Sequence, residues 1–153
     1  LQFLTKKLRL NLNYCQLLSI LIVRYNKNNI CFCNEFRLSK KDREYINFIY
    51  EQYKLIKKEL YSYQTIRRQI YFYKKHLALD FLNFIFCAEK KINFKFFLRY
   101  RLFINKFKVP RFPISGDFLI KKGFKQGKEL GKKLELLKEY WIKNNFKLNF
   151  RDI

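Results

Sequence analysis

Apolar residues recur at helical spacing along most of this chain of 153 residues. In the clearest stretch, successive apolar residues are four, four, three and four positions apart: Tyr45, Ile49, Tyr53, Ile56 and Leu60. These intervals place the five side chains on one face of an amphipathic helix. The segment from Ser39 to Asp42 resembles a capping box and marks the start of that helix.

The same periodicity predicts helices on both sides of this stretch. We expect them over residues 14–25, 66–77, 79–90 and 93–106, with a loop over residues 26–36. The segment 79–90 is expected to be central because it carries few charges and contains Leu82, Ile85 and Phe86. The segment 93–106 is expected to present an apolar face made of four residues: Phe94, Phe97, Leu98 and Leu102.

Strands are the competing interpretation, because Phe, Tyr and Ile all favour them. All four glycines and both prolines, however, lie between positions 110 and 131, so the first 109 residues contain no glycine hairpin turn. We therefore predict an all-α fold. It divides into a helical body region over residues 1–106 and a helical hairpin, the tail, over residues 107–153, packed as one unit.

The tail combines turn signals with a helical stripe. Pro110 and Pro113 predict an extended approach, Ser115 can cap a short helix over 116–122, and Gly123 suits the left-handed position at its end. A last helix begins near Gly127. Four residues form its apolar stripe: Leu130, Leu134, Leu137 and Trp141.

Charge points to a polyanionic partner. The chain has 34 Lys and Arg against 12 Asp and Glu, a formal net charge of +22. Part of this charge is attributed to an AT-rich genome, which favours Lys, Asn, Phe, Ile and Tyr codons. Five candidate RNA-binding lysines surround the glycine-rich turn of the tail and the free N–H groups of the helix that follows: Lys121, Lys122, Lys125, Lys128 and Lys132. Arg111 is the sixth candidate.

Other chemistry is weakly represented. Cys15, Cys31, Cys33 and Cys87 do not have the spacing of a structural zinc site, so we expect buried free thiols and no metal. The single histidine, His76, is read as structural, since no nucleophile or carboxylate spacing singles it out. Tyrosines alternate with cations in residues 61–75. This pattern is typical either of a surface that binds single-stranded RNA or of the edge of a helical core, and we favour the core.

Membrane association is not expected. The longest charge-free run covers residues 10–23 and is too short to span a bilayer, and no small-residue cleavage site follows it. The chain is expected in a bacterial cytoplasm or in an organellar matrix. Because the first residue is Leu1, either a non-standard start codon or a piece of a longer chain is expected.

The glycine pattern of the tail resembles a known family. It contains F-P-[IL]-x-G, then a glycine seven residues on, then G-x-x-x-G, and finally an apolar helix that ends in W-[IL]. This pattern resembles the C-terminus of bacterial tRNA nucleotidyltransferases and poly(A) polymerases. The matching residues are Phe112, Pro113, Ile114, Gly116, Gly123, Gly127, Gly131, Trp141, Ile142 and Phe146. Residues 37–44 are similar to the start of a helix in the body of the same family.

The chain also departs from this family. Asp117 stands one place earlier than the family's acid, and Gln126-Gly127-Lys128 replaces the usual P-G-P turn. In the family, a catalytic head carries a Gly-Ser loop and a D-x-D pair, and uses Mg²⁺ with ATP or CTP. This chain has neither motif, so we expect no catalytic residue, no metal and no cofactor in it.

The resemblance implies a C-terminal body and tail that hold tRNA or other RNA, with a separately encoded head as a possible partner. Two alternatives remain open. One is a basic ribosomal or mitoribosomal structural protein. The other is an inactive product of a split or degraded gene.

Overall fold

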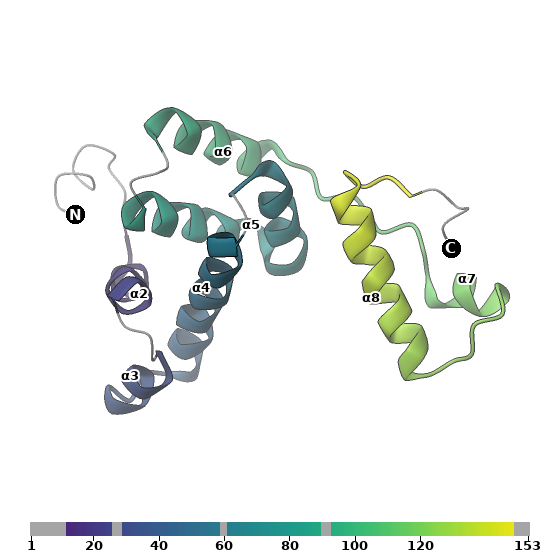
Figure 1. Cartoon of the computed structure of the whole chain (residues 1–153), viewed down its shortest axis with the longest axis horizontal. Helices are drawn as coiled ribbons and strands as arrows, with labels where there is room; N and C mark the ends of the chain where they lie inside the picture. Colours follow the sequence, from purple (N-terminus) through teal and green to yellow (C-terminus); the bar gives the residue numbers. More distant parts are fainter. Residues whose placement is uncertain (1–11, 26–28, 59–60, 90–92, 149–153) are drawn as a thin grey trace.

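The structure, a computed structural model, describes residues 12–25, 29–58, 61–89 and 93–148. In these ranges the chain forms seven helices and no strand, which confirms the all-α prediction (Figure 1). The helices are α2 (Tyr14–Tyr25), α3 (Asn29–Glu35), α4 (Lys40–Lys58), α5 (Tyr63–Ala88), α6 (Phe94–Lys106), α7 (Gly116–Lys121) and α8 (Lys128–Lys143).

The described helices pack around three apolar clusters. The first joins α2, α3, α4 and α5 and includes Ile20, Ile49 and Phe81, each 1 % exposed or less. The second joins both halves of α5 to α6. The third lies within the tail and is made by Ile114, Leu119, Leu130 and Leu137. The body region and the tail therefore each have apolar packing of their own.

Helix α4 follows its predicted periodicity closely. Ile49 and Tyr53 are buried, Tyr45 and Ile56 are half-buried, and Leu60 lies outside the described residues. Ile46, which the predicted face omitted, is fully buried as well.

The start of α4 is capped as predicted, although the side chains bond differently from a standard capping box. The Ser39 Oγ accepts a hydrogen bond from the Asp42 backbone N–H at 3.2 Å and donates one to the Asp42 carboxylate at 2.7 Å. The other oxygen of that carboxylate accepts from the Cys15 thiol at 3.0 Å. Asp42 therefore ties the first turn of α4 to α2 as well as to its own cap.

The loop predicted over residues 26–36 is wrong for its described part, because α3 covers Asn29–Glu35. Cys33 is 3 % exposed and Phe32 packs on the first cluster. Burial of these side chains therefore stabilises a helix in a segment whose polar neighbours in sequence had indicated a loop. Arg37 ends the helix in the left-handed region with φ 45°, and the Leu38 N–H donates to the Cys33 carbonyl at 3.1 Å.

The two helices predicted over 66–77 and 79–90 are present as the two halves of α5, but the break between them lies earlier than predicted. The break lies at Lys74 (φ 74°, ψ 160°), whereas Ala78 is fully buried inside the helix. Ile66 and Ile70 before the kink and Leu82 after it all belong to the second cluster. The bend therefore lets both halves of α5 pack against α6. The prediction that the later half is central is confirmed, because Leu82, Ile85 and Phe86 are buried.

Helix α6 begins after its Asn93 cap as expected, but its predicted apolar face is largely wrong. Phe97 is buried, whereas Phe94, Leu98 and Leu102 are 49 %, 41 % and 58 % exposed. The face against α5 is made by Phe97 and Ile104, with Tyr100 and Phe103 half-buried beside them. Apolar residues occur around most of this helix, so the sequence allowed two faces and packing selected the other one.

The tail follows its predicted local structure. The Ser115 hydroxyl accepts from the Phe118 N–H at 3.2 Å, and Gly123 has φ 95° after the end of α7. The Gly123 N–H donates to the Ile120 carbonyl and the Phe124 N–H to the Leu119 carbonyl, a Schellman motif. In α8, Leu130, Leu137 and Trp141 are buried and Leu134 is half-buried, so the predicted stripe faces inward.

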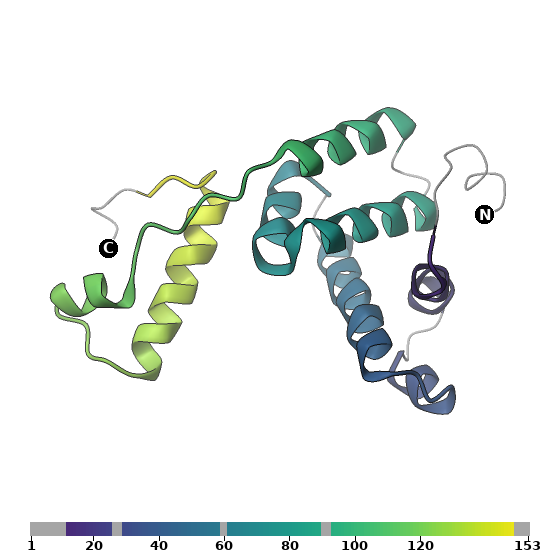
Figure 2. The same cartoon turned by 180° about the vertical axis from the view of Figure 1, so that it is seen from behind.

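An aromatic cluster joins the tail to the body. Trp141, 2 % exposed, meets the rings of Tyr71 on α5, Phe112 before α7 and Phe146 after α8, with centroids 5.6, 5.2 and 4.8 Å away. Polar contacts lie beside it, since the Gln64 amide donates to the Lys143 carbonyl at 3.2 Å. Figures 1 and 2 show α8 beside the first half of α5 at this junction.

Replacing Trp141 with alanine is expected to lower the free energy of unfolding by about 3–5 kcal/mol, because the large buried ring leaves a cavity where three chain segments meet. Urea unfolding followed by far-ultraviolet circular dichroism measures the change. The control is Leu136→Ala on the same helix, where the side chain is 67 % exposed and a change within about 0.5 kcal/mol is expected. Equal effects of the two substitutions on the free energy of unfolding would contradict the role of Trp141 in joining the tail to the body.

The Asp42 carboxylate gives the stability a defined pH dependence. Hydrogen bonds lower its pKa from 3.8 to about 2, the donors in order of effect being Cys15, Tyr14 and Ser39. A lowered pKa stabilises the fold fully above about pH 4, and this contribution is lost as the pH falls toward 2. The difference in unfolding free energy between the wild type and Asp42→Asn should therefore be constant from pH 7 to 5 and shrink below pH 4. A difference that grows on acidification would refute this role.

Candidate nucleic-acid interface

The six predicted RNA-binding residues are all exposed on the tail. Five of them lie between the last residue of α7 and the second turn of α8, around the turn that connects the two helices: Lys121, Lys122, Lys125, Lys128 and Lys132. Arg111 lies apart in sequence, on the extended segment that leads from α6 to α7. The structure therefore gathers five of the cations at one end of the tail.

Because they form no ion pair with the described carboxylates, these cations remain able to bind an anion. Within the described residues, no carboxylate lies within ion-pair distance of any of the six. Lys122 instead lies over the Phe118 ring, 5.9 Å from its centroid. Asp117 and Glu129 are exposed in the first turns of α7 and α8, so the end of the tail is not uniformly positive.

The N-terminus of α8 adds a partial positive charge to the same region. Gly127 is its N-cap residue, and no side chain accepts a hydrogen bond from the first turn. Backbone N–H groups at such an end are left to solvent or to an anion. A phosphate near Lys125 and Lys128 would meet both fixed dipoles and mobile ammonium groups.

The residues of the glycine motif serve the backbone and the packing of the tail. Gly123 and Gly127 have φ of 95° and 143°, conformations that side chains with a Cβ rarely adopt. Trp141 and Phe112 belong to the aromatic cluster of the junction. The other two glycines, Gly116 and Gly131, show no comparable constraint, since a Cβ at Gly131 would point into open space and one at Gly116 would make ordinary contact with Leu130.

Most of the tyrosines and cations of residues 61–75 are engaged within the protein. The rings of Tyr61 and Tyr63 pack against Tyr100, and the Tyr73 ring packs against Phe48. Arg68 forms an ion pair with Glu139 on α8, with its Nη2 3.0 Å from the Glu139 Oε1. These contacts support the interpretation of this segment as the edge of the core.

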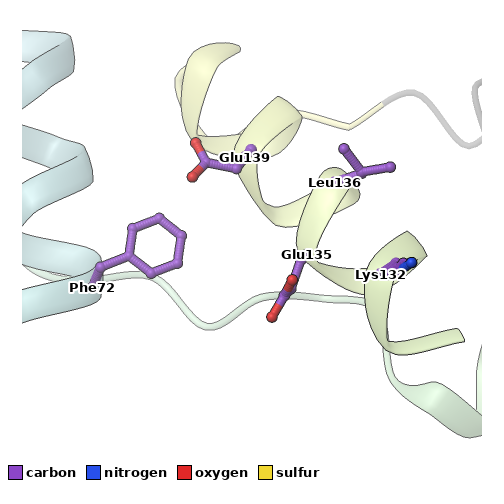
Figure 3. A pocket seen from close by; sticks show the side chains of 5 residues that line it. All are labelled: Phe72, Lys132, Glu135, Leu136 and Glu139. Atoms are coloured by element: carbon purple, nitrogen blue, oxygen red, sulfur yellow. The ribbon is translucent and has the colours of Figure 1, made fainter. Parts of the chain in front are cut away.

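A groove between α5 and α8 was not predicted. Figure 3 shows Phe72 pointing from α5 toward α8, where Lys132, Glu135, Leu136 and Glu139 line the opposite side of a space of about 420 Å³. Lys132 therefore belongs to a groove wall as well as to the charged end of the tail. The available sequence signal was Leu136, an apolar residue outside the stripe that ends at Trp141.

The four cysteines, all within the described ranges, are not joined in disulfides, but the expectation that their thiols are all buried is wrong. Cys15 and Cys33 are buried, Cys87 is half-buried and Cys31 is exposed. Burial raises the pKa of the Cys15 thiol, and the neutral thiol donates to Asp42. His76 is exposed.

Neither a metal-ligand cluster nor a membrane-crossing helix occurs in the described ranges. No three His, Cys, Asp or Glu side chains come together there in a way that could hold a metal ion. Similarly, none of the helices α2 to α8 is long and apolar enough to cross a bilayer.

Comparison with known proteins gives one short similarity. A stretch of 46 residues, 30 % of this chain, is 37 % identical to CCA tRNA nucleotidyltransferase 1, mitochondrial, from Danio rerio. The match covers 11 % of the zebrafish protein. No protein-family model matches the chain, and no solved structure matches it. The similarity supports a relation to the tRNA nucleotidyltransferases, and because the relative is a vertebrate mitochondrial protein, it does not single out the bacterial branch of that family.

Proposed function

We propose that this chain is an RNA-binding portion of a protein related to tRNA nucleotidyltransferases or poly(A) polymerases, and that it holds the 3′ region of tRNA or other RNA. The observation that carries the proposal is the group of lysines at the α7–α8 turn, which are exposed and form no ion pair with the described carboxylates. The short similarity to a CCA tRNA nucleotidyltransferase supports the choice of RNA over other polyanions.

The proposed mechanism is electrostatic. Lysines at the turn neutralise backbone phosphates and release counterions, which supplies affinity without reading the base sequence. The first turn of α8 offers backbone N–H groups to a phosphate of the same strand. The aromatic junction at Trp141 holds this surface in a fixed position relative to the body helices.

The proposal assigns no nucleotide addition to these 153 residues. Their four aspartates, Asp42, Asp80, Asp117 and Asp152, are far apart in sequence, so no pair has the D-x-D spacing that two-metal nucleotidyl transfer uses. A head encoded elsewhere would supply Mg²⁺ and the nucleotide. The role of this chain is then to position RNA for a partner.

Binding of tRNA by the purified chain is expected to depend steeply on salt, with affinity falling about a hundredfold or more between 50 and 200 mM. Substitution of Lys121, Lys122 and Lys125 together by glutamine should reduce the slope of log K against log salt by about 0.9 for each phosphate that is no longer neutralised. Fluorescence anisotropy with labelled tRNA measures both. The control triple variant, Lys40, Lys41 and Lys54 to glutamine on α4, removes the same charge from another exposed surface.

Two results would count against this prediction. Absence of tRNA binding at 50 mM salt would refute the proposal that the chain binds RNA. Equal slopes for the two triple variants would show that general charge, rather than the turn of the tail, holds the RNA.

The chain alone is expected to incorporate no CMP or AMP into tRNA. Incubation with labelled CTP or ATP, Mg²⁺ and tRNA lacking its 3′ end tests this directly, with an active tRNA nucleotidyltransferase as the positive control. Metal-dependent incorporation that survives repurification would show that the reacting groups lie in this chain after all.

A further inference from the structure

We propose that the outward face of α6 is a binding track for unpaired RNA, distinct from the lysines of the α7–α8 turn. This inference rests on the proposed RNA-binding function and names a second contact for it. Figures 1 and 2 show α6 along the top edge of the molecule, with α5 beneath it and none of the other described helices above it.

The charge on this segment is of one sign. Residues 93–116 contain no Asp or Glu, and their six cations are all exposed: Lys95, Arg99, Arg101, Lys106, Lys108 and Arg111. No ion pair or hydrogen bond within the described residues engages the side chains of the four on α6. A surface of this kind attracts phosphate and repels basic partners, including other copies of this chain.

Two exposed aromatic rings accompany the cations. Phe94 and Phe96 are 49 % and 46 % exposed. Phe94 is stacked on the buried Phe97 at a centroid distance of 6.5 Å, and Phe96 on Tyr100 at 6.2 Å. Each ring is therefore supported on one side by the core and open on another, the arrangement that lets a base stack without ordering the ring first.

The order of residues around the helix favours RNA over a protein partner. At about 100° per residue, Lys95, Arg99 and Lys106 fall within about 40° of one another, in the middle of the outward face. Phe94, Leu98 and Leu102 form a narrow exposed stripe on one side of this row, and Phe96 lies on the other side. The cations run along this stripe and separate it from Phe96, so a partner that covers the face must complement a row of positive charge, as an RNA strand does.

The position of this face also fits an unpaired strand. The row from Lys95 to Lys106 is about 16 Å long, at 1.5 Å per residue. From its end, Lys108 and Arg111 continue along the extended segment toward the tail. A strand that leaves a duplex held at the tail therefore meets cations along its path.

The test compares two probes, a labelled twelve-nucleotide oligouridylate and a labelled hairpin duplex, by fluorescence anisotropy at 50 mM salt. Phe94→Ala with Phe96→Ala is expected to weaken oligouridylate binding by at least about thirtyfold, because two stacking platforms are removed, and to leave duplex binding unchanged. The control is Phe36→Ala, at a phenylalanine that is 62 % exposed outside α6. Thermal melting shows whether each variant remains folded.

A second pair of variants tests the cations. Lys95→Gln with Arg99→Gln should lower the salt slope for oligouridylate by about 1.4, roughly 0.7 for each single-strand phosphate that these residues neutralise. Lys121→Gln with Lys122→Gln should lower the slope for the duplex instead.

The outcomes separate this inference from the proposed function. If the wild type binds the duplex but not oligouridylate, or if the phenylalanine variant binds oligouridylate as the wild type does, the α6 track is wrong and RNA binding by the tail stands. If oligouridylate binds and the duplex does not, the track stands and the tail proposal fails. Loss of self-association in the phenylalanine variant, with unchanged oligouridylate binding, would assign the face to a protein contact and overturn the inference.

Discussion

The packing of Trp141 is the interaction on which the arrangement of tail and body depends. Its ring touches side chains from α5, from the segment before α7 and from the segment after α8, so one residue joins three parts of the chain. The Arg68–Glu139 ion pair lies beside it but is partly exposed, and such pairs contribute about 1 kcal/mol or less. Because the junction is mainly aromatic, the candidate RNA-binding cations of the tail are not needed to form it. The charged surface and the contact that positions it are thus physically independent.

The net charge of +22 sets a second constraint on the molecule. Only two ion pairs occur within the described residues, Lys54–Glu51 and Arg68–Glu139, so most cations there are balanced by solvent ions. Mutual repulsion of this kind opposes the compact state and is relieved when a polyanion binds. The apolar clusters of body and tail stabilise the fold against it. RNA binding and folding stability are therefore expected to be coupled, with the largest effect at low salt.

Local signals predicted the fold well where one interpretation dominated. The Ser39 and Ser115 caps, the stripe of α8 and the left-handed Gly123 follow from residue type and spacing alone. The errors arose where tertiary packing decides. Helix α3 forms because Cys33 and Phe32 reach the first cluster, and α5 bends at Lys74 so that both its halves meet α6. The face of α6 was misassigned because its apolar residues surround the helix. The candidate site shows the same division: the exposure of its lysines was expected, whereas the groove opposite Phe72 depends on how α8 lies against α5.

The glycine motif has a physical role that does not depend on catalysis. Gly123 and Gly127 supply positive φ at the two ends of the α7–α8 turn, and Trp141 with Phe112 supplies the junction. A chain that keeps these residues keeps the shape of the tail whether or not a catalytic head is attached. Gly131 has no such constraint, since its Cβ position is open. It is therefore a motif position at which a requirement from RNA, rather than from the fold, can be recognised: if Gly131→Ala preserves or raises stability and weakens RNA binding, the strand must approach the α8 backbone at this point.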